Sequence, residues 1–273
     1  MTRRRKWTLA LGAVLAVAAA LWAAWLVVRP PVLDVAGRRV ETRIEGIGSP
    51  AVIFELGSSG GNLAYWQVQN AVAKHTKTLV YERAGLGRSS LGVEPRSAEQ
   101  MARELHELLR ATDTAPPYVL VGHSYGGLLI RVFAHRYPAE IAGLVFIDPA
   151  TEGLYDHLRA ETPTEWAAAA NALNEGFRRQ WLGMSEAISQ AQRAWPLPEV
   201  PTTVISADTP LGQWPLKTAH DVALFQKEQM ALLARIPGAR HVLIAHSDHM
   251  TILRRSELAD EILKIVQRAA PRT

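Results

Sequence analysis

The stretch Gly122-His123-Ser124-Tyr125-Gly126 decides the fold of this 273-residue chain. It follows residues 118–121, an apolar run typical of a buried strand, and precedes a helical pattern that starts near Leu128. Glycines two residues before and after a serine allow a sharp strand-to-helix turn, because side chains there would collide with neighbouring backbone. The turn exposes Ser124 Oγ as a candidate nucleophile, beside backbone N–H groups that favour developing negative charge.

Outward from this turn, strand signals alternate with helical signals, without internal repeats or low-complexity tracts. Strands are expected over residues 32–36, 39–45, 51–56, 78–81, 118–121, 142–147, 202–206 and 241–245. Helices are expected over residues 97–110, 128–137, 221–235 and 251–268. This alternation predicts an α/β fold with a mostly parallel sheet that is covered by helices on both faces.

Some fifty residues between Asp148 and Pro201 interrupt the alternation. They are rich in alanine and glutamate, mostly helical in pattern, and contain no core strand. An insertion at the end of a strand predicts a helical cap, here at about residues 149–200. Its tryptophans, Trp166, Trp181 and Trp195, are expected to pack the cap onto the body or to line the mouth of a pocket.

The composition excludes several classes of protein. The chain has no cysteine, which excludes disulfides, a cysteine nucleophile and thiolate metal sites. The formal net charge of +4 is supplied by Arg3-Arg4-Arg5-Lys6, so residues 7–273 carry no net charge. Nucleic-acid binding requires a basic surface that neutralises phosphates, so the sequence argues against a nucleic-acid partner.

The four cations precede an apolar segment, residues 8–28, all but two of which are hydrophobic. A helix of this length reaches about 30 Å, the thickness of the hydrocarbon core of a bilayer. The segment predicts a transmembrane anchor and linker within residues 1–31, with the domain at residues 32–273 in the periplasm or outside the cell. A cleaved signal peptide and a secreted protein stay open, because Ala18-Ala19-Ala20 suits a cleavage site.

Four further motifs, together with the turn at Ser124, resemble the α/β-hydrolase superfamily. They are Tyr81-Glu82-Arg83-Ala84-Gly85-Leu86-Gly87-Arg88-Ser89, Tyr137-Pro138, Gly143-Leu144-Val145-Phe146-Ile147-Asp148-Pro149 and Ser247-Asp248-His249-Met250. The resemblance covers nearly the whole chain after residue 32, although Glu82 stands where the family most often has aspartate. It points to capped hydrolases related to prolyl aminopeptidases, epoxide hydrolases and small-ester esterases. It implies an eight-stranded, mostly parallel sheet with a cap inserted after the sixth strand.

A serine at the turn limits the chemistry. Epoxide and haloalkane hydrolases of this fold carry aspartate at the position of Ser124, so the serine argues against both reactions. A serine hydroxyl needs a base within hydrogen-bond reach. The resemblance puts that base at His249, with His246 as the alternative, while His123 is expected to pack inside the turn. The irregular spacing of the neighbouring histidines argues against a metal site.

The carboxylate that orients the base is open between Asp148 and Asp208, both of which follow expected strands. The commoner family position, after the seventh strand, favours Asp208, although the long loop that usually precedes the acid is missing there. Asp148 ends the sixth strand directly, and some relatives place their acid at that position. We expect Asp148 to be the acid and keep Asp208 as the alternative.

The negative charge that develops during acyl transfer needs two N–H donors. Tyr125, the residue after the nucleophile, supplies one donor. The resemblance implies the backbone of Ser58 as the second donor, in the loop Gly57-Ser58-Ser59-Gly60-Gly61. No lysine follows this loop in P-loop register, which argues against a nucleotide site.

These residues predict a serine hydrolase that cleaves a small-molecule ester or amide through an acyl-enzyme. Ser124 attacks the carbonyl and His249 transfers the proton. A carboxylic ester is favoured over a peptide bond, and no cofactor or metal is expected. Two alternatives stay open: an acyltransferase that uses the same acyl-enzyme, and a catalytically silent binding protein with this fold. The sequence leaves the oligomeric state open.

Overall fold

The computed structural model describes residues 29–171, 174–208 and 218–269, and its main compact unit is Val32–Thr273. Within those described ranges, no helix combines the length and the apolarity that a bilayer crossing requires. The expected membrane segment, residues 8–28, lies outside the described residues. The anchor therefore stays a prediction.

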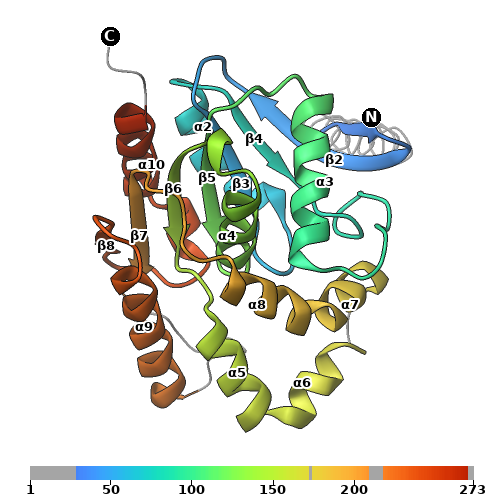
Figure 1. Ribbon diagram of the computed structural model, residues 1–273, viewed down its shortest axis with the longest axis vertical. Helices are drawn as coiled ribbons and strands as arrows, with labels where there is room; N and C mark the ends of the chain where they lie inside the picture. The colour runs from blue at the N-terminus through green and yellow to red at the C-terminus, as the bar shows by residue number, and fades with distance from the viewer. Residues whose placement is uncertain (1–28, 172–173, 209–217, 270–273) are drawn as a thin grey trace, which may run out of the picture. The chain divides into compact units, whose positions relative to one another are not determined.

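Eight strands form a single sheet (Figure 1). They are β1 (Val32–Val35), β2 (Arg38–Glu45), β3 (Ala51–Glu55), β4 (Thr78–Tyr81), β5 (Tyr118–His123), β6 (Ile141–Ile147), β7 (Thr202–Ala207) and β8 (Arg240–Ile244). Their order across the sheet is β1-β2-β4-β3-β5-β6-β7-β8, and β2 runs in the direction opposite to the other seven strands. The expected eight-stranded, mostly parallel sheet is confirmed, and every strand lies within two residues of its expected bounds.

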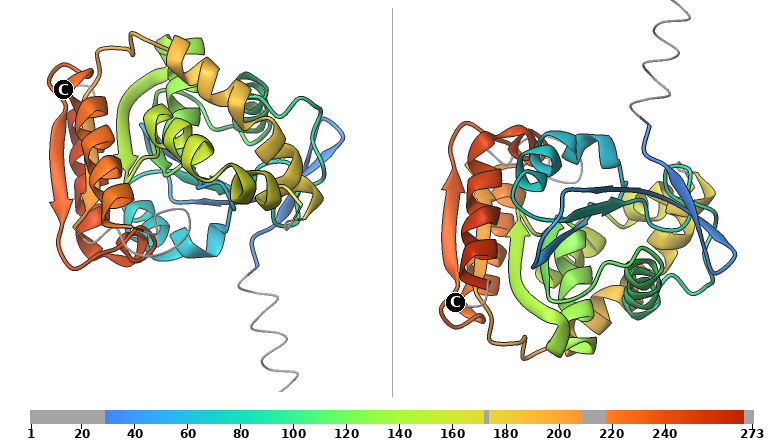
Figure 2. Two further views of the ribbon diagram at one scale, coloured as in Figure 1. Left: turned by 90° about the horizontal axis from the view of Figure 1, so that it is seen from below. Right: turned by 90° about the horizontal axis from the view of Figure 1, so that it is seen from above.

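Helices cover both faces of the sheet (Figure 2). One face carries α3 (Ala98–Ala111), α4 (Gly126–Arg136) and α9 (Ala219–Ala234), and the other carries α2 (Trp66–Ala73) and α10 (Ser256–Ala269). Successive strand residues serve opposite faces, since Val119 and Val121 belong to one buried cluster and Leu120 to the other. The central strands are therefore buried on both sides, which explains their continuous apolar sequence.

Two helical segments differ from the expectation. The closing helix expected over residues 251–268 is divided into η3 (Thr251–Arg254) and α10, because Arg255 adopts an extended backbone with φ −79° and ψ 131°. The elements η1 (Asn62–Tyr65) and α2 were not expected at all. Helix α2 has only eight residues, several of them polar, so its apolar spacing is too short to stand out.

Four helices lie between β6 and β7 and form the cap (Figure 1). They are α5 (Glu152–Glu161), α6 (Pro163–Ala169), α7 (Glu175–Leu182) and α8 (Met184–Arg193). Inside the cap, the rings of Trp166 and Trp181 lie 4.4 Å apart, and Trp181 Nε1 donates a hydrogen bond to Trp166 O. Trp195 contacts the guanidinium groups of Arg131 and Arg235. These tryptophans pack the cap together and join it to the body.

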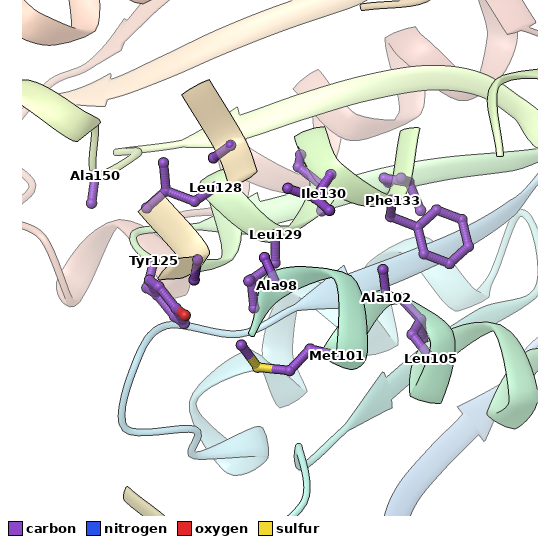
Figure 3. Packing of buried hydrophobic residues seen from close by; sticks show 14 of the residues in the cluster. Ala98, Met101, Ala102, Leu105, Tyr125, Leu128, Leu129, Ile130, Phe133 and Ala150 are labelled. Atoms are coloured by element: carbon purple, nitrogen blue, oxygen red, sulfur yellow. The ribbon is translucent and has the colours of Figure 1, made fainter. Parts of the chain in front are cut away.

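Helix α4, which follows Ser124, is surrounded by other parts of the protein. Residues 126–134 of this helix are all buried. Figure 3 shows its Leu129 and Phe133 beside Met101 and Leu105 of α3. A helix with apolar residues around most of its circumference belongs in a core, and its buried Arg131 is paired with Glu152. The turn that carries Ser124 is therefore built on a rigid part of the molecule.

Candidate active site

The turn at Ser124 has the geometry that its glycines require. Ser124 has φ +54°, a left-handed conformation that is rare for residues with a side chain. A Cβ atom on Gly122 would lie 2.7 Å from Gly126 O, and a Cβ atom on Gly126 would lie 2.2 Å from Glu55 O. Both positions therefore exclude any larger residue. Strain of this kind is concentrated at functional sites in many proteins.

The structure brings His249 and Asp148 together from segments that are 101 residues apart in sequence. His249 Nδ1 and Asp148 Oδ2 are separated by 2.6 Å. A carboxylate only accepts hydrogen bonds, so His249 Nδ1 carries a proton, and in the neutral ring Nε2 then presents a lone pair. This tautomer is the one that a general base beside a serine requires.

Asp148 is buried, with 1% of its side chain exposed, and its other oxygen is also engaged. Asp148 Oδ1 accepts hydrogen bonds from Gln229 Nε2 at 2.9 Å and from the Ala207 N–H at 3.2 Å. Burial by itself raises the pKa of Asp148, but His249, Gln229 and Ala207 outweigh burial and hold that pKa below its ordinary value. The carboxylate therefore stays ionised while it orients His249.

The alternative acid, Asp208, has a different set of contacts. Its carboxylate accepts hydrogen bonds from the N–H groups of His246, at 2.7 Å, and Ser247, at 3.0 Å. It therefore holds the backbone of the loop that leads to His249. The alternative base, His246, has φ +54° in this loop and an exposed side chain.

His123 joins the turn to the loop of His249. Its Nε2 lies 2.9 Å from His249 O, and its Nδ1 lies 2.8 Å from the Tyr65 hydroxyl. The carbonyl can only accept, so Nε2 carries the proton and Tyr65 donates to Nδ1. Burial, followed by the nearby His249, lowers the pKa of His123 to about 3, so its ring stays neutral. As expected, His123 packs inside the turn.

Ser124 lies beside the residues that His123 positions. The rings of His123 and His249 are 4.6 Å apart, and His123 directly precedes Ser124. Within the described residues, no hydrogen bond joins the Ser124 hydroxyl to His249. Catalytic hydrogen bonds in substrate-free enzymes are often long and shorten in the substrate complex.

The glycine-rich loop after β3 lies against the turn. A Cβ atom on Gly57 would lie 3.7 Å from Ser124 Cβ. Among the described residues, the N–H groups of Ser58 and Tyr125 donate no hydrogen bond to the protein. The residues after Ser124 and after Gly57 thus each have an unused N–H group, and oxyanion sites are built from N–H groups of this kind.

A buried polar network under this loop was not expected from the sequence. Arg83, which is 2% exposed, donates hydrogen bonds to Glu55 Oε1, Gly57 O and Gln180 Oε1. Burial by itself lowers the pKa of Arg83, but the nearby Glu55 carboxylate outweighs burial and holds that pKa above its ordinary value. Arg83 therefore stays a cation. Glu55 offered a signal, because an acid that ends an apolar strand needs a buried partner.

A cavity of about 460 Å³ lies elsewhere on the molecule, and its lining residues include His106, Tyr118 and Glu140. Tyr118 begins β5, whose opposite end leads to Ser124. This cavity contains none of the expected site residues. Ligands of open α/β sheets bind at the carboxyl ends of the strands, where Ser124 and Asp148 lie.

Comparisons with known proteins agree with this architecture. The chain is 33% identical over 142 residues to "Probable transporter efuK" of Hormonema carpetanum, a match that covers 49% of this chain and 20% of that protein. It is 26% identical over 219 residues to "Putative carbamate hydrolase RutD" of Azorhizobium caulinodans, which covers 80% of this chain and 71% of that protein. The chain spans 20% to 42% of the length of three curated relatives that it matches.

Solved structures share the fold. The enol-lactonase from Burkholderia xenovorans LB400 is 20% identical and superimposes with a TM-score of 0.64, covering 87% of this chain and all of that one. A family model described as the alpha/beta hydrolase fold matches residues 50–194, which include the loop after β3, the turn at Ser124 and Asp148. The chain therefore belongs to the alpha/beta hydrolase fold family.

Proposed function

We propose that this protein is a serine hydrolase in which Ser124, His249 and Asp148 form a catalytic triad. The observation that carries the proposal is the 2.6 Å contact between His249 Nδ1 and the buried Asp148 carboxylate, beside the turn of Ser124. A buried carboxylate that fixes the histidine tautomer is what a serine nucleophile requires of its partners. A binding protein without catalysis has no need for this arrangement.

The proposed reaction has two halves. Ser124 Oγ attacks the substrate carbonyl carbon while His249 Nε2 takes the hydroxyl proton. The carbonyl oxygen becomes an oxyanion that accepts hydrogen bonds from the N–H groups of Tyr125 and Ser58. Collapse expels the alcohol or amine, which receives the proton from His249. Water, activated by His249, then cleaves the acyl-enzyme and restores Ser124.

A carboxylic ester is the proposed substrate class. The enol-lactonase with the same fold is named for a lactone, which is a cyclic ester, and the RutD relative is named for a carbamate. Both compounds have a carbonyl carbon that a serine can attack. An alkoxide leaves more readily than an amide anion, so an ester makes a smaller demand than an amide on the proton that His249 supplies to the leaving group.

The test is the exchange Ser124→Ala. We expect kcat on a p-nitrophenyl ester to fall by about 10³-fold or more, with labelling by a fluorophosphonate lost. The melting temperature should stay within a few degrees, since one oxygen of a half-buried side chain is removed without opening a core cavity. Ser185→Ala, an exposed serine of the cap, is the matched control. Hydrolysis at the wild-type rate by a folded alanine variant contradicts the proposal, and a panel of lactone, carbamate and peptide amide ranks the substrates.

We also propose that residues 8–28 anchor the protein in a membrane with the hydrolase domain outside the cytoplasm. The proposal is supported by the apolar length of this segment and by the four cations before it. Protease treatment of spheroplasts and the mass of the mature chain test it. A chain that begins near Leu21 would instead indicate a cleaved signal and a secreted protein.

A further inference from the structure

The loop at residues 57–61 is held by a side chain of the cap. We infer that Gln180 of α7 is a positioning residue for the proposed hydrolase. It fixes the Ser58 backbone, so the position of α7 on the body affects the geometry of the oxyanion site. The inference rests on the proposed function and deepens it. It also gives a role to the motif Tyr81-Glu82-Arg83-Ala84-Gly85-Leu86-Gly87-Arg88-Ser89, which the triad leaves unused.

The carbonyl groups of two successive peptides of the loop accept hydrogen bonds from Arg83 and Gln180. Gly57 O accepts a hydrogen bond from Arg83 Nη2 at 2.6 Å. Ser58 O accepts one from Gln180 Nε2 at 2.6 Å and a longer one from Arg83 Nη2 at 3.3 Å. Fixing the planes on both sides of a residue fixes its φ and ψ, so the conformation of Ser58 is set by Arg83 and Gln180.

The first of these peptide groups contains both the Gly57 carbonyl and the Ser58 N–H. In a trans peptide these two groups point in opposite directions. When Arg83 holds the carbonyl, the N–H must point away from Arg83. A charge-assisted hydrogen bond to the carbonyl also polarises the peptide and strengthens its N–H as a donor.

Gln180 controls Arg83 as well as Ser58. Arg83 Nε donates to Gln180 Oε1 at 2.8 Å, so a single side chain of the cap orients the guanidinium and binds the loop. Gln180 is 1% exposed. A buried amide is costly unless its donor and acceptor are both satisfied, and here each has a partner next to the proposed site.

The other end of the loop is held by the residue next to Arg83. Glu82 Oε1 accepts hydrogen bonds from the N–H groups of Gly61 and Asn62, at 2.8 and 2.6 Å. Glu82 and Arg83 thus clamp the loop on both sides of the proposed donor. The Arg83 side of this clamp is shared with the cap through Gln180.

The first turn of α7 packs directly against Gly85, in the loop after β4. A Cβ atom on Gly176, in the first turn of α7, would lie 1.8 Å from Gly85 O. This contact places α7 directly on the loop that follows Arg83. The packing of α7 against this loop therefore sets the position of Gln180 relative to Ser58.

The test compares two glutamines of the cap in the full-length protein. Gln180→Met keeps the volume but removes both hydrogen bonds, and Gln180→Asn keeps the amide but is too short to reach Ser58. The matched control is Gln190→Met in α8, which removes a 2.8 Å hydrogen bond from the Glu99 N–H to the cap, away from the loop. Fluorophosphonate titration counts the active sites, so that kcat is measured per folded site.

Both Gln180 variants are expected to lose about 10- to 100-fold in kcat, less than the 10²- to 10³-fold typical of deleting an oxyanion donor. KM should change less than threefold. Affinity for an aryl trifluoromethyl ketone should fall in parallel with kcat, since Ser124 Oγ adds to its carbonyl, His249 takes the proton, and the oxygen becomes an oxyanion. A merely structural role would lower the melting temperature without affecting this affinity.

Gln190→Met should keep kcat within about twofold. The inference is overturned if the Gln180 variants keep their kcat, or if all three variants lose kcat equally. Failure of the proposed function is recognised separately, because Ser124→Ala would then remain active and wild-type protein would not be labelled.

Discussion

Asp148 and Asp208 have the same position relative to their strands but different contacts. Each directly follows a strand, and these strands, β6 and β7, are parallel neighbours. Asp148 Oδ2 lies 2.6 Å from His249 Nδ1, whereas the Asp208 carboxylate accepts the N–H groups of His246 and Ser247. A carboxylate at the end of a strand can therefore orient a side chain or cap a loop.

The register of the two strands explains the difference. Ile147 pairs with Ile205, so Asp148 is level with Ser206, and Asp208 lies two residues farther out from the sheet. Asp148 is buried between the two strand ends, and its carboxylate reaches the Ala207 N–H. Asp208 extends over the next loop, where backbone donors are available.

The two aspartates therefore act on the same loop in different ways. Asp148 contacts the ring of His249, and Asp208 holds the backbone two and three residues before it. A family position after a strand therefore identifies candidates for the acid, while the contacts distinguish them. The same substitution is expected to have unequal effects at the two positions.

The largest effect is expected for Asp148→Asn compared with Asp208→Asn. Asp148→Asn should lower kcat/KM by about 10³- to 10⁴-fold, because the amide no longer stabilises the protonated histidine or fixes its tautomer. Asp208→Asn keeps one oxygen for the loop and should lose less than about tenfold, with about 1 kcal/mol of stability. Steady-state kinetics and urea unfolding on both variants measure these values. If Asp208→Asn alone were inactive, the acid would be Asp208 and the comparison would be reversed.

An intermediate effect is expected for Gln229→Met. This exchange removes the 2.9 Å donor to Asp148 Oδ1 from α9 while keeping the volume of the side chain. The carboxylate keeps His249 and the Ala207 N–H, so kcat should fall about tenfold, as when a hydrogen bond to a charged group is lost. Gln226→Met, on the exposed side of the same helix, is the matched control. Equal kinetics for the two variants would show that Gln229 does not help to hold Asp148.

The smallest effect concerns the pH dependence of stability. The pKa of Asp148 is lower in the folded protein than in the unfolded chain, where a free aspartate has a pKa of about 3.9. Its ionised form therefore stabilises the fold above about pH 4, and this contribution disappears as the pH falls through the folded pKa. Urea unfolding at pH 6 and pH 3 should show the stability of the wild type relative to Asp148→Asn decreasing with acid. A relative stability that increases toward pH 3 would contradict the charged state assigned to Asp148.

The sequence predicted most of the sheet because local signals agree with one another there. The central strands are short apolar runs bounded by glycine, proline and polar residues, and their expected bounds are close to the observed ones. The prediction was wrong where the local signal was weak or interrupted. It missed α2, which has eight residues, and it did not anticipate the extended backbone of Arg255 that divides the closing helix.

The candidate site shows the same distinction. Ser124 was identified because the two glycines and the flanking elements are local features. The residues under the loop, Arg83 and Gln180, were not identified as a pair because 97 residues separate them in sequence. Glu55 at the end of β3 needs hydrogen-bond donors once it is buried, and the packing of β4 and the loop after it decides that Tyr81 and Arg83 supply them.

The sequence by itself determined the fold family, the turn that carries Ser124 and the short set of residues that could complete a site. These features depend on residues close together in the chain, where spacing alone decides which backbone conformations are allowed. The tertiary structure decided which aspartate meets His249 and which cap residue holds Ser58. Those choices depend on strand register and on where the cap packs on the body. Both are established only when distant segments pack together and bury their polar groups in pairs.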